Sequence, residues 1–170
     1  CRTEHELSQE LKQKLALFCN VKPDAVIQSI DASTIYEVPN LMLEEKLDTV
    51  ALKKLALPEK SMPNLTQWND FVYRLKNPKH TITVGLVGKY VELQDSYKSI
   101  LEAFIHAGAT HNTKVNVVSL HSEYINANSA ETQFKNIDGI LVAPGFGERG
   151  IEGKIETVKY ARERGIPFFG

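Results

Sequence analysis

The stretch DGILVAPGFGERGIEG, residues 138–153, decides how the C-terminal half of the chain folds. It begins with the apolar run DGILVAP and passes into a segment that contains Gly145, Gly147 and Gly150. A short apolar run bounded by turn residues is typical of a strand buried in a parallel sheet. The stretch therefore predicts a strand that ends in a glycine-rich loop, and the group that this loop binds bears directly on function.

Three further apolar runs predict strands around this one. They are TITVGLVG (81–88), KVNVVSL (114–120) and IPFFG (166–170). Asp95 stands where it would cap a helix that Gly108 ends, and a second helix is predicted from Lys154 to Arg164, closed by Gly165. Strands that alternate with helices form βαβ units. We predict an α/β fold with an open, mostly parallel sheet and flanking helices.

The N-terminal third is predicted to be helix, short strand and helix. Thr3-x-x-Glu6 matches a capping box before a first helix, residues 25–30 fit a short strand, and residues 33–57 fit a second helical stretch interrupted near Pro39. The apolar positions of the first helix recur at helical spacing: Leu7, Leu11, Leu15 and Phe18. Cys19, beside Phe18, is expected to be buried.

Residues 58–80 are predicted to be a linker with one helix. Pro58, Pro63 and Pro78 bracket a segment whose apolar side chains fall at i, i+3, i+4 and i+7: Trp68, Phe71, Val72 and Leu75. A polar break, KNPKH, follows before the first predicted strand. The chain is therefore divided into residues 1–57, a linker at 58–80, and residues 81–170.

Composition excludes several classes of protein. Hydrophobic residues make up 42% and charged residues 24% of the 170 residues, and 20 basic against 21 acidic side chains give a net charge of −1. This balance gives no bulk attraction to nucleic acid or anionic membrane, and there is no apolar run of membrane-spanning length. No His or Cys pair has metal-ligand spacing, so no metal site is expected. Two cysteines and no secretory signal fit a reducing cytoplasm.

Two kinds of ligand are compatible with the glycine loop. Its G-x-G-x-x-G spacing matches dinucleotide-binding loops, but these follow the first strand and have a carboxylate about 20 residues on. Here the glycines follow the third strand, and Gly170 stands at that distance. The other reading uses the amides of Gly145 and Gly147 as donors to a developing oxyanion at a strand end. A plain turn without a ligand is the third alternative.

Two blocks of sequence resemble the CTP synthase family. GLVGKYVELQDSYKSILEAF (85–104) with DGILVAPGFGERGIEGK (138–154) is similar to the start of its class I glutamine amidotransferase domain. LALFCNVKPDAVIQSIDASTIYEVP (15–39) is similar to the end of its amidoligase (synthetase) domain. The resemblance implies that residues 1–57 end an amidoligase domain and that residues 81–170 form the N-terminal half of a glutaminase domain.

The resemblance also implies an activity and its ligands. Members of this family make CTP from UTP, with ATP and Mg²⁺, ammonia from glutamine and GTP as activator, in a cytoplasmic homotetramer without nucleic-acid or membrane partners. The family's Cys-His-Glu triad is expected outside these residues, so this segment alone is expected to be inactive. Two alternatives remain: another class I glutamine amidotransferase, or a non-catalytic, truncated interaction module.

Site residues follow from the positions that match the family's motifs. In the glutaminase half, Gly145 matches the glycine whose backbone helps to build the oxyanion hole, and Phe146 matches a residue beside the glutamine pocket. Positions linked to GTP activation are matched by Arg149, Gly150, Glu152, Lys89 and Lys98. In the synthetase half, Lys14 matches a nucleotide-binding lysine that contacts the pyrimidine. The segment that contacts adenine is matched by Ile30, Asp31 and Ala32.

Relatives often carry other residues at two of these positions. Many read Pro-Gly-Gly-Phe-Gly where this chain has Ala143-Pro144-Gly145-Phe146-Gly147, so Pro144 removes one backbone N–H. Relatives often have Lys at the position of Ile30, so a contact there is expected from the backbone. We expect Gly145 and the residue after the nucleophile to supply the oxyanion donors, which leaves Pro144 tolerated.

Overall fold

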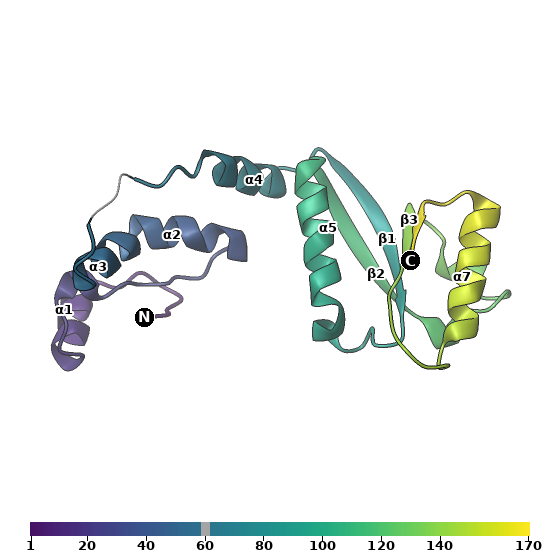
Figure 1. Ribbon diagram of the computed structural model, residues 1–170, viewed down its shortest axis with the longest axis horizontal. Helices are drawn as coiled ribbons and strands as arrows, with labels where there is room; N and C mark the ends of the chain where they lie inside the picture. Colours follow the sequence, from purple (N-terminus) through teal and green to yellow (C-terminus); the bar gives the residue numbers. More distant parts are fainter. Residues whose placement is uncertain (59–61) are drawn as a thin grey trace. The chain divides into compact units, whose positions relative to one another are not determined.

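The computed structural model describes residues 1–58 and 62–170, which fall into two compact units (Figure 1). The first unit covers Cys1–Thr66 and the second covers Gln67–Gly170. The division lies inside the stretch 58–80 that the sequence marks as a linker. The domain bounds inferred from the sequence stay a prediction, and each unit is described by itself.

The first unit consists of short helices joined by irregular segments. These elements are α1 (Gln9–Phe18), η1 (Pro23–Ala25), η2 (Ile35–Glu37), α2 (Val38–Glu44) and α3 (Leu47–Lys54). Ser8 caps α1, because its hydroxyl accepts a hydrogen bond from the Leu11 N–H at 3.2 Å. The capping box predicted at Thr3 is therefore wrong, and the Thr3 hydroxyl donates instead to the carbonyl of His5.

Two further expectations for this unit are wrong. Residues 26–30 form no strand, and a single bridge joins Ser29 to Arg2. The long helical stretch breaks at Lys46, which has a φ of 59°, and not near Pro39. Pro39 lies in the first turn of α2, where its missing N–H has no helical partner to lose.

Glu45, at the end of α2, connects three segments of the first unit. Its carboxylate accepts hydrogen bonds from the Lys12 ammonium at 2.9 Å, from the Gln28 side chain at 2.9 Å and from the Gln28 backbone N–H at 3.2 Å. Gln28 in turn accepts from the Leu7 N–H. Burial raises the pKa of Glu45, but these hydrogen bonds and the charge of Lys12 outweigh it, so the pKa lies below its ordinary value of 4.5.

The second unit is built on a parallel sheet. Its helix α4 (Thr66–Lys76) begins at the boundary and is the single helix expected there. The strands are β1 (His80–Gly88), β2 (Thr113–His121), β3 (Gly139–Val142) and β4 (Phe168–Phe169). They pair in parallel in the order β2-β1-β3-β4. The predicted α/β fold with a parallel sheet is confirmed.

Helices cover both faces of this sheet. They are η3 (Gln94–Tyr97), α5 (Lys98–Thr110), η4 (Ser122–Tyr124), α6 (Ala130–Gln133) and α7 (Ile151–Arg164). Helices α5 and α7 lie on opposite sides of the strands in Figure 1. Neighbouring residues of β1 accordingly enter different cores: Leu86 packs with Tyr97 and Ala143, while Val87 packs with residues that include Ile140 and Ala161.

The predicted helix ends are partly wrong. Asp95 lies within η3, and α5 begins only at Lys98 without a side-chain cap. Gly108 does not end α5 but is buried inside it, and a Cβ there would lie 2.4 Å from the carbonyl oxygen of Thr113. The glycine thus permits the close contact between α5 and β2. Helix α7 begins at Ile151, earlier than expected, and Gly165 ends it with a φ of 65°, as predicted.

We expect Glu45→Gln to remove a pH-dependent part of the stability of the first unit. A carboxyl whose folded pKa is lowered stabilises the fold above its unfolded pKa, near 4.5, and this contribution is lost as pH falls through the folded pKa. Amide hydrogen exchange of α2 and α3 between pH 7 and pH 3 should show wild type and variant converging at low pH.

Glu44→Gln is the matched control, because Glu44 is exposed and adjacent. If the Glu45→Gln protein stayed equally destabilised at every pH, the hydrogen-bonding account of Glu45 would be contradicted.

Candidate functional site

The candidate site lies where the strand order changes direction. From β1 the chain continues to β2 on one side, whereas from β3 it continues to β4 on the other, so β1 and β3 are the neighbours at the switch. The segments that follow Gly88 and Val142 leave the same edge of the sheet, because the strands are parallel. Open α/β sheets bind ligands outside the carboxyl ends of their strands at such a point.

The glycine loop, residues 143–150, leaves this edge and leads into α7. At its start, Ala143 is buried and its N–H donates to the carbonyl of Val87 at 2.8 Å. Gly147 and Gly150 have φ values of 86° and 75°, a region that glycine enters without steric cost. The side chain of Phe146 is 99% exposed. The loop is therefore held at the sheet and open to solvent at Phe146.

Two lysines, Lys89 and Lys154, lie against this loop and are called the lysine pair below. Lys89 follows β1, is only 7% exposed, and its ammonium donates to the carbonyl of Phe146. Lys154 lies in α7 and donates to the carbonyl of Ala143 at 2.8 Å. Lys89 was predicted as a GTP-linked residue, but Lys154 was not predicted as a site residue. The sequence does hint at Lys154, because it places a lysine in the first turns of a predicted helix, where the helix dipole disfavours positive charge.

The charges of the lysine pair are close together, and the described residues give neither of them an acidic partner. Burial lowers the pKa of Lys154, and the nearby charge of Lys89 lowers it further. Within residues 1–58 and 62–170, no Asp or Glu forms an ion pair with either lysine. Partly buried charges of one sign are costly, and such costs concentrate at functional sites.

Arg149 connects the glycine loop to two other segments. Its Nε lies 2.9 Å from the Glu123 carboxylate, its guanidinium donates to the carbonyl of Lys89 at 3.3 Å, and it lies 5.7 Å from the centre of the Tyr90 ring. The structure thus brings Arg149 and Lys89 together, as two of the predicted GTP-linked residues. Glu123 and Tyr90 were missed, because only the tertiary structure places them beside Arg149.

The other predicted GTP-linked residues differ in their surroundings. Gly150 packs against Ser122, since a Cβ at this glycine would lie 2.1 Å from the Ser122 hydroxyl oxygen. Glu152 is exposed in the first turn of α7. Lys98 is the first residue of α5 and is exposed, and among the described contacts of the glycine loop none involves its side chain.

The predicted nucleotide-binding residues of the first unit differ in exposure, since Lys14 and Asp31 are exposed and Ile30 and Ala32 are half-buried. Lys14 is exposed on α1. Ile30, Asp31 and Ala32 follow the bridge between Ser29 and Arg2, and the Asp31 carboxylate pairs with Arg2 at 2.7 Å. Both partners of this ion pair are largely exposed, so it contributes little to stability.

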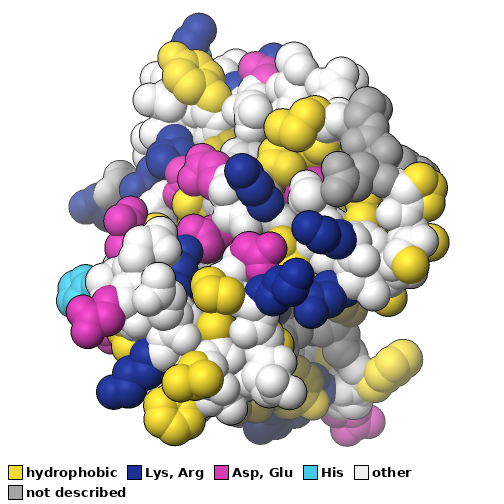
Figure 2. Space-filling view, turned by 90° about the vertical axis from the view of Figure 1, so that its left-hand side faces the viewer, with side chains coloured by type: hydrophobic (Ala, Val, Ile, Leu, Met, Phe, Trp, Pro, Cys, Tyr) yellow, Lys and Arg dark blue, Asp and Glu magenta, His cyan; other side chains and the backbone are white. Residues whose placement is uncertain are grey.

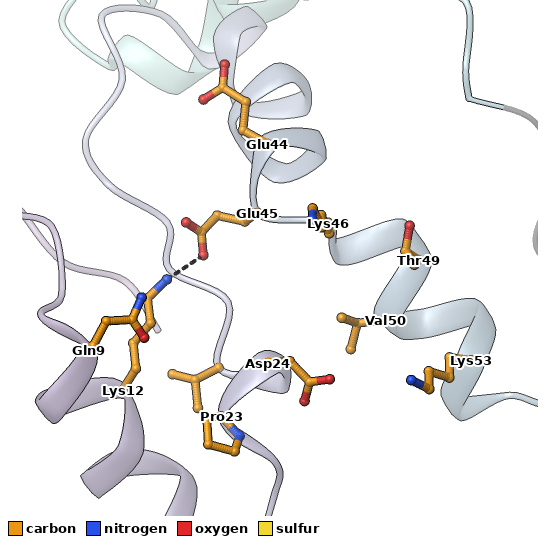
Figure 3. A pocket seen from close by; sticks show the side chains of 11 residues that line it. Gln9, Lys12, Pro23, Asp24, Glu44, Glu45, Lys46, Thr49, Val50 and Lys53 are labelled. Atoms are coloured by element: carbon orange, nitrogen blue, oxygen red, sulfur yellow. Dashed lines mark hydrogen bonds and ion pairs between the residues drawn. The ribbon is translucent and has the colours of Figure 1, made fainter.

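A cavity of about 660 Å³ also lies in the first unit (Figure 3). Lys12 and Glu45 meet at one side of it, and Asp24 and Lys53 point toward one another from η1 and α3. Lys14 and residues 30–32 do not line it. Figure 2 shows basic and acidic side chains interspersed on the face in view, without a patch of one sign. The cavity is lined by both acidic and basic side chains, so its charge does not indicate which class of ligand it would bind.

Metals and thiols add little to the site. In the described part of the chain, no three His, Cys, Asp or Glu side chains are grouped to hold a metal ion. Cys1 and Cys19 are both free and exposed, which makes the expected burial of Cys19 wrong. Among the described residues, none of the helices is long and apolar enough to cross a membrane.

Comparisons with known proteins match both halves of the chain. Residues 1–57 match the family model "CTP synthase N-terminus", and residues 92–170 match "Glutamine amidotransferase class-I". The whole chain is 76% identical to CTP synthase from Flavobacterium psychrophilum and 75% identical to that from Flavobacterium johnsoniae. The chain is therefore similar to CTP synthases along its whole length.

The match is to part of a longer sequence. The chain spans about a third (32%) of the length of each of these curated relatives. A solved structure, the glutaminase domain of Trypanosoma brucei CTPS with bound acivicin, is 33% identical with a TM-score of 0.49, covering 52% of this chain and 35% of that one. Within the CTP synthase family match, the glycine loop lies in the amidotransferase part, whereas Lys14 and residues 30–32 lie in the N-terminal part.

We predict that Gly150→Ala destabilises the second unit more than Gly165→Ala. Both glycines have positive φ, which costs an alanine about 1–2 kcal/mol. Only at Gly150 does the added Cβ also meet Ser122, whereas nothing lies within 4 Å of one at Gly165. Overpacking of this kind adds about 1–3 kcal/mol. Hydrogen exchange of the α7 amides measures both costs, and equal losses would contradict the packing of Gly150 on Ser122.

Proposed function

We propose that this chain is part of a CTP synthase that aminates UTP to CTP with ammonia released from glutamine. The observation that carries the proposal is the order of the two matches in one chain, a CTP synthase N-terminus followed by a class I glutamine amidotransferase. A different class I amidotransferase would account for the second match but not for the first. The two activities are linked, because ammonia is the product of one and the substrate of the other.

In the synthetase half, we assign nucleotide contacts to residues that the structure leaves accessible. Lys14 is exposed, and its ammonium is suited to the negatively charged UTP. The backbone of Ile30, Asp31 and Ala32 is assigned to the adenine of ATP. When bound, ATP and Mg²⁺ supply the phosphoryl group that activates the uracil 4-oxygen for displacement by ammonia. The ligands of Mg²⁺ are assigned to other parts of the full-length protein.

In the glutaminase half, we assign Gly145 to the oxyanion hole. Attack of a nucleophile on the amide of glutamine places negative charge on the carbonyl oxygen, and a backbone N–H fixed nearby stabilises it. Phe146 is fully exposed beside Gly145 and is assigned to the wall of the glutamine pocket. The Cys-His-Glu triad is assigned to the part of the protein outside these residues.

GTP activation is assigned to the charged residues around the loop. Arg149 contacts the backbone of Lys89 and the carboxylate of Glu123, so an anion that attracts Arg149 would change both contacts. Gly150 and Glu152 follow Arg149 directly at the start of α7, and Lys98 completes the proposed set. We further propose a cytoplasmic homotetramer without nucleic-acid or membrane partners, in keeping with the net charge of −1.

The direct test is CTP formation by the full-length protein that carries this chain. With UTP, ATP and Mg²⁺, we expect CTP from either glutamine or ammonium chloride, with GTP raising only the glutamine-driven rate. The 170 residues alone are expected to form no CTP and to hydrolyse no glutamine. CTP formation is measured by chromatography and glutamine hydrolysis by released glutamate.

The possible results separate the alternatives. Glutamine hydrolysis coupled to an acceptor other than UTP would indicate another class I amidotransferase. A full-length protein that neither hydrolyses glutamine nor makes CTP would support a non-catalytic interaction module.

Pro144→Gly tests whether the missing amide of Pro144 limits the reaction. We expect the variant to show no increase in kcat for glutamine hydrolysis, because Gly145 and the residue after the nucleophile are assigned as the oxyanion donors. Loss of one true donor costs about 10²–10³-fold in kcat. A sharp rise in kcat after Pro144→Gly would therefore show that the oxyanion hole of the natural protein is one donor short.

A further inference from the structure

The lysine pair holds two positive charges close together in a partly buried environment. Lys89 is almost fully buried and Lys154 partly buried, and the described residues offer neither of them a carboxylate partner. A Cβ on Gly145 would lie 3.9 Å from the Nζ of each lysine, so both ammonium groups are close to this one residue. The mutual repulsion of the pair has to be offset by the contacts that each lysine makes.

These contacts are to the carbonyls on either side of a two-residue span. Lys154 holds the carbonyl of Ala143 and Lys89 holds the carbonyl of Phe146, and only Pro144 and Gly145 lie between those residues. The ring of Pro144 fixes its φ. The Lys89 stem packs against Gly145, since its Cε lies 3.2 Å from where a Cβ would be. The two lysines therefore restrain the backbone on both sides of Pro144 and Gly145, and the Pro144 ring and the Lys89 stem restrain these two residues themselves.

We propose that the lysine pair positions the backbone amides of the glycine loop for the oxyanion that forms on glutamine. The N–H and C=O of a trans peptide point in opposite directions. Because the carbonyl of Phe146 points to Lys89, the N–H of Gly147 points away from it. The restraints on Pro144 and Gly145 likewise hold the N–H of Gly145 in one orientation. Lys89 and Lys154 are thus positioning residues, which act through the loop.

The charge of the pair adds a second effect. A hydrogen bond from an ammonium to a carbonyl polarises that peptide, and polarised peptides are stronger donors through their N–H. Lys89 acts in this way on the peptide between Phe146 and Gly147. Lys154 acts on the peptide between Ala143 and Pro144, which has no N–H, so its part is to fix the exit of the loop from β3. The two lysines are therefore not equivalent.

This inference rests on the proposed function, since it requires the loop to face glutamine. The test uses the full-length protein and the variant Lys154→Met, which keeps an unbranched side chain as far as the ε position and removes the ammonium. We expect kcat for glutamine hydrolysis to fall about tenfold, less than the 10²–10³-fold cost of a lost oxyanion donor. The KM for glutamine should change less than about twofold, because loop orientation matters when charge develops.

Two references separate positioning from general damage. Lys159→Met removes an exposed lysine from the same helix and should leave kcat unchanged. Its ammonium pairs with Glu156 at 3.4 Å and lies in none of the described contacts of the loop. Ammonia-driven CTP formation bypasses glutamine hydrolysis and should be equal in wild type and Lys154→Met. The Lys89→Met variant should lose more of kcat than Lys154→Met, because Lys89 is the more deeply buried of the pair and holds the carbonyl of the residue that directly follows Gly145.

Each other outcome counts against one claim. An unchanged kcat in Lys154→Met, or equal losses in the glutamine-driven and ammonia-driven rates, would overturn the positioning role and leave the proposed function intact. A wild-type protein that forms CTP from neither glutamine nor ammonia would refute the proposed function itself.

Discussion

The pairing of β3 with β1 is the constraint on which the rest of the site depends. The hydrogen bond from Ala143 to Val87 extends this pairing to the first residue of the glycine loop. Because the strands are parallel, the same pairing places the residues after β1 beside those after β3. Arg149 therefore meets Lys89 and Tyr90, although Lys89 lies 60 positions before it in the sequence.

The sheet was predictable from the sequence because its strands are buried. The residues of β1 from Val84 to Gly88 are all buried, and a strand covered on both faces gives an uninterrupted apolar run. The glycine loop was predictable for a related reason, since closely spaced glycines after a strand indicate an irregular, exposed backbone. Both features are local in the sequence, so they can be recognised without knowledge of the tertiary structure.

The errors have a common cause in tertiary contacts. Gly108 has the sequence signal of a helix end, but its role is to let α5 approach β2. The described part of the first unit offers no sheet for the predicted strand at residues 25–30 to join, and Ser29 there forms a single bridge to Arg2. Lys154 and Glu123 belong to the site through partners that are distant in sequence or lie on another element. Composition and periodicity do not contain that information.

The position of Lys154 depends in turn on glycines that carry no chemistry. A Cβ on Gly153 would lie 1.7 Å from the carbonyl oxygen of Ser122, so α7 contacts η4 more closely than any side chain at this position would permit. Gly150 makes the same approach one turn earlier. This packing fixes where α7 begins and how it is rotated, and rotation decides which side chains face the loop. The ammonium of Lys154 reaches Ala143 because Gly150 leaves room for the side chain of Ser122 and Gly153 for its backbone, so the electrostatics of the loop follow from the steric fit of this helix.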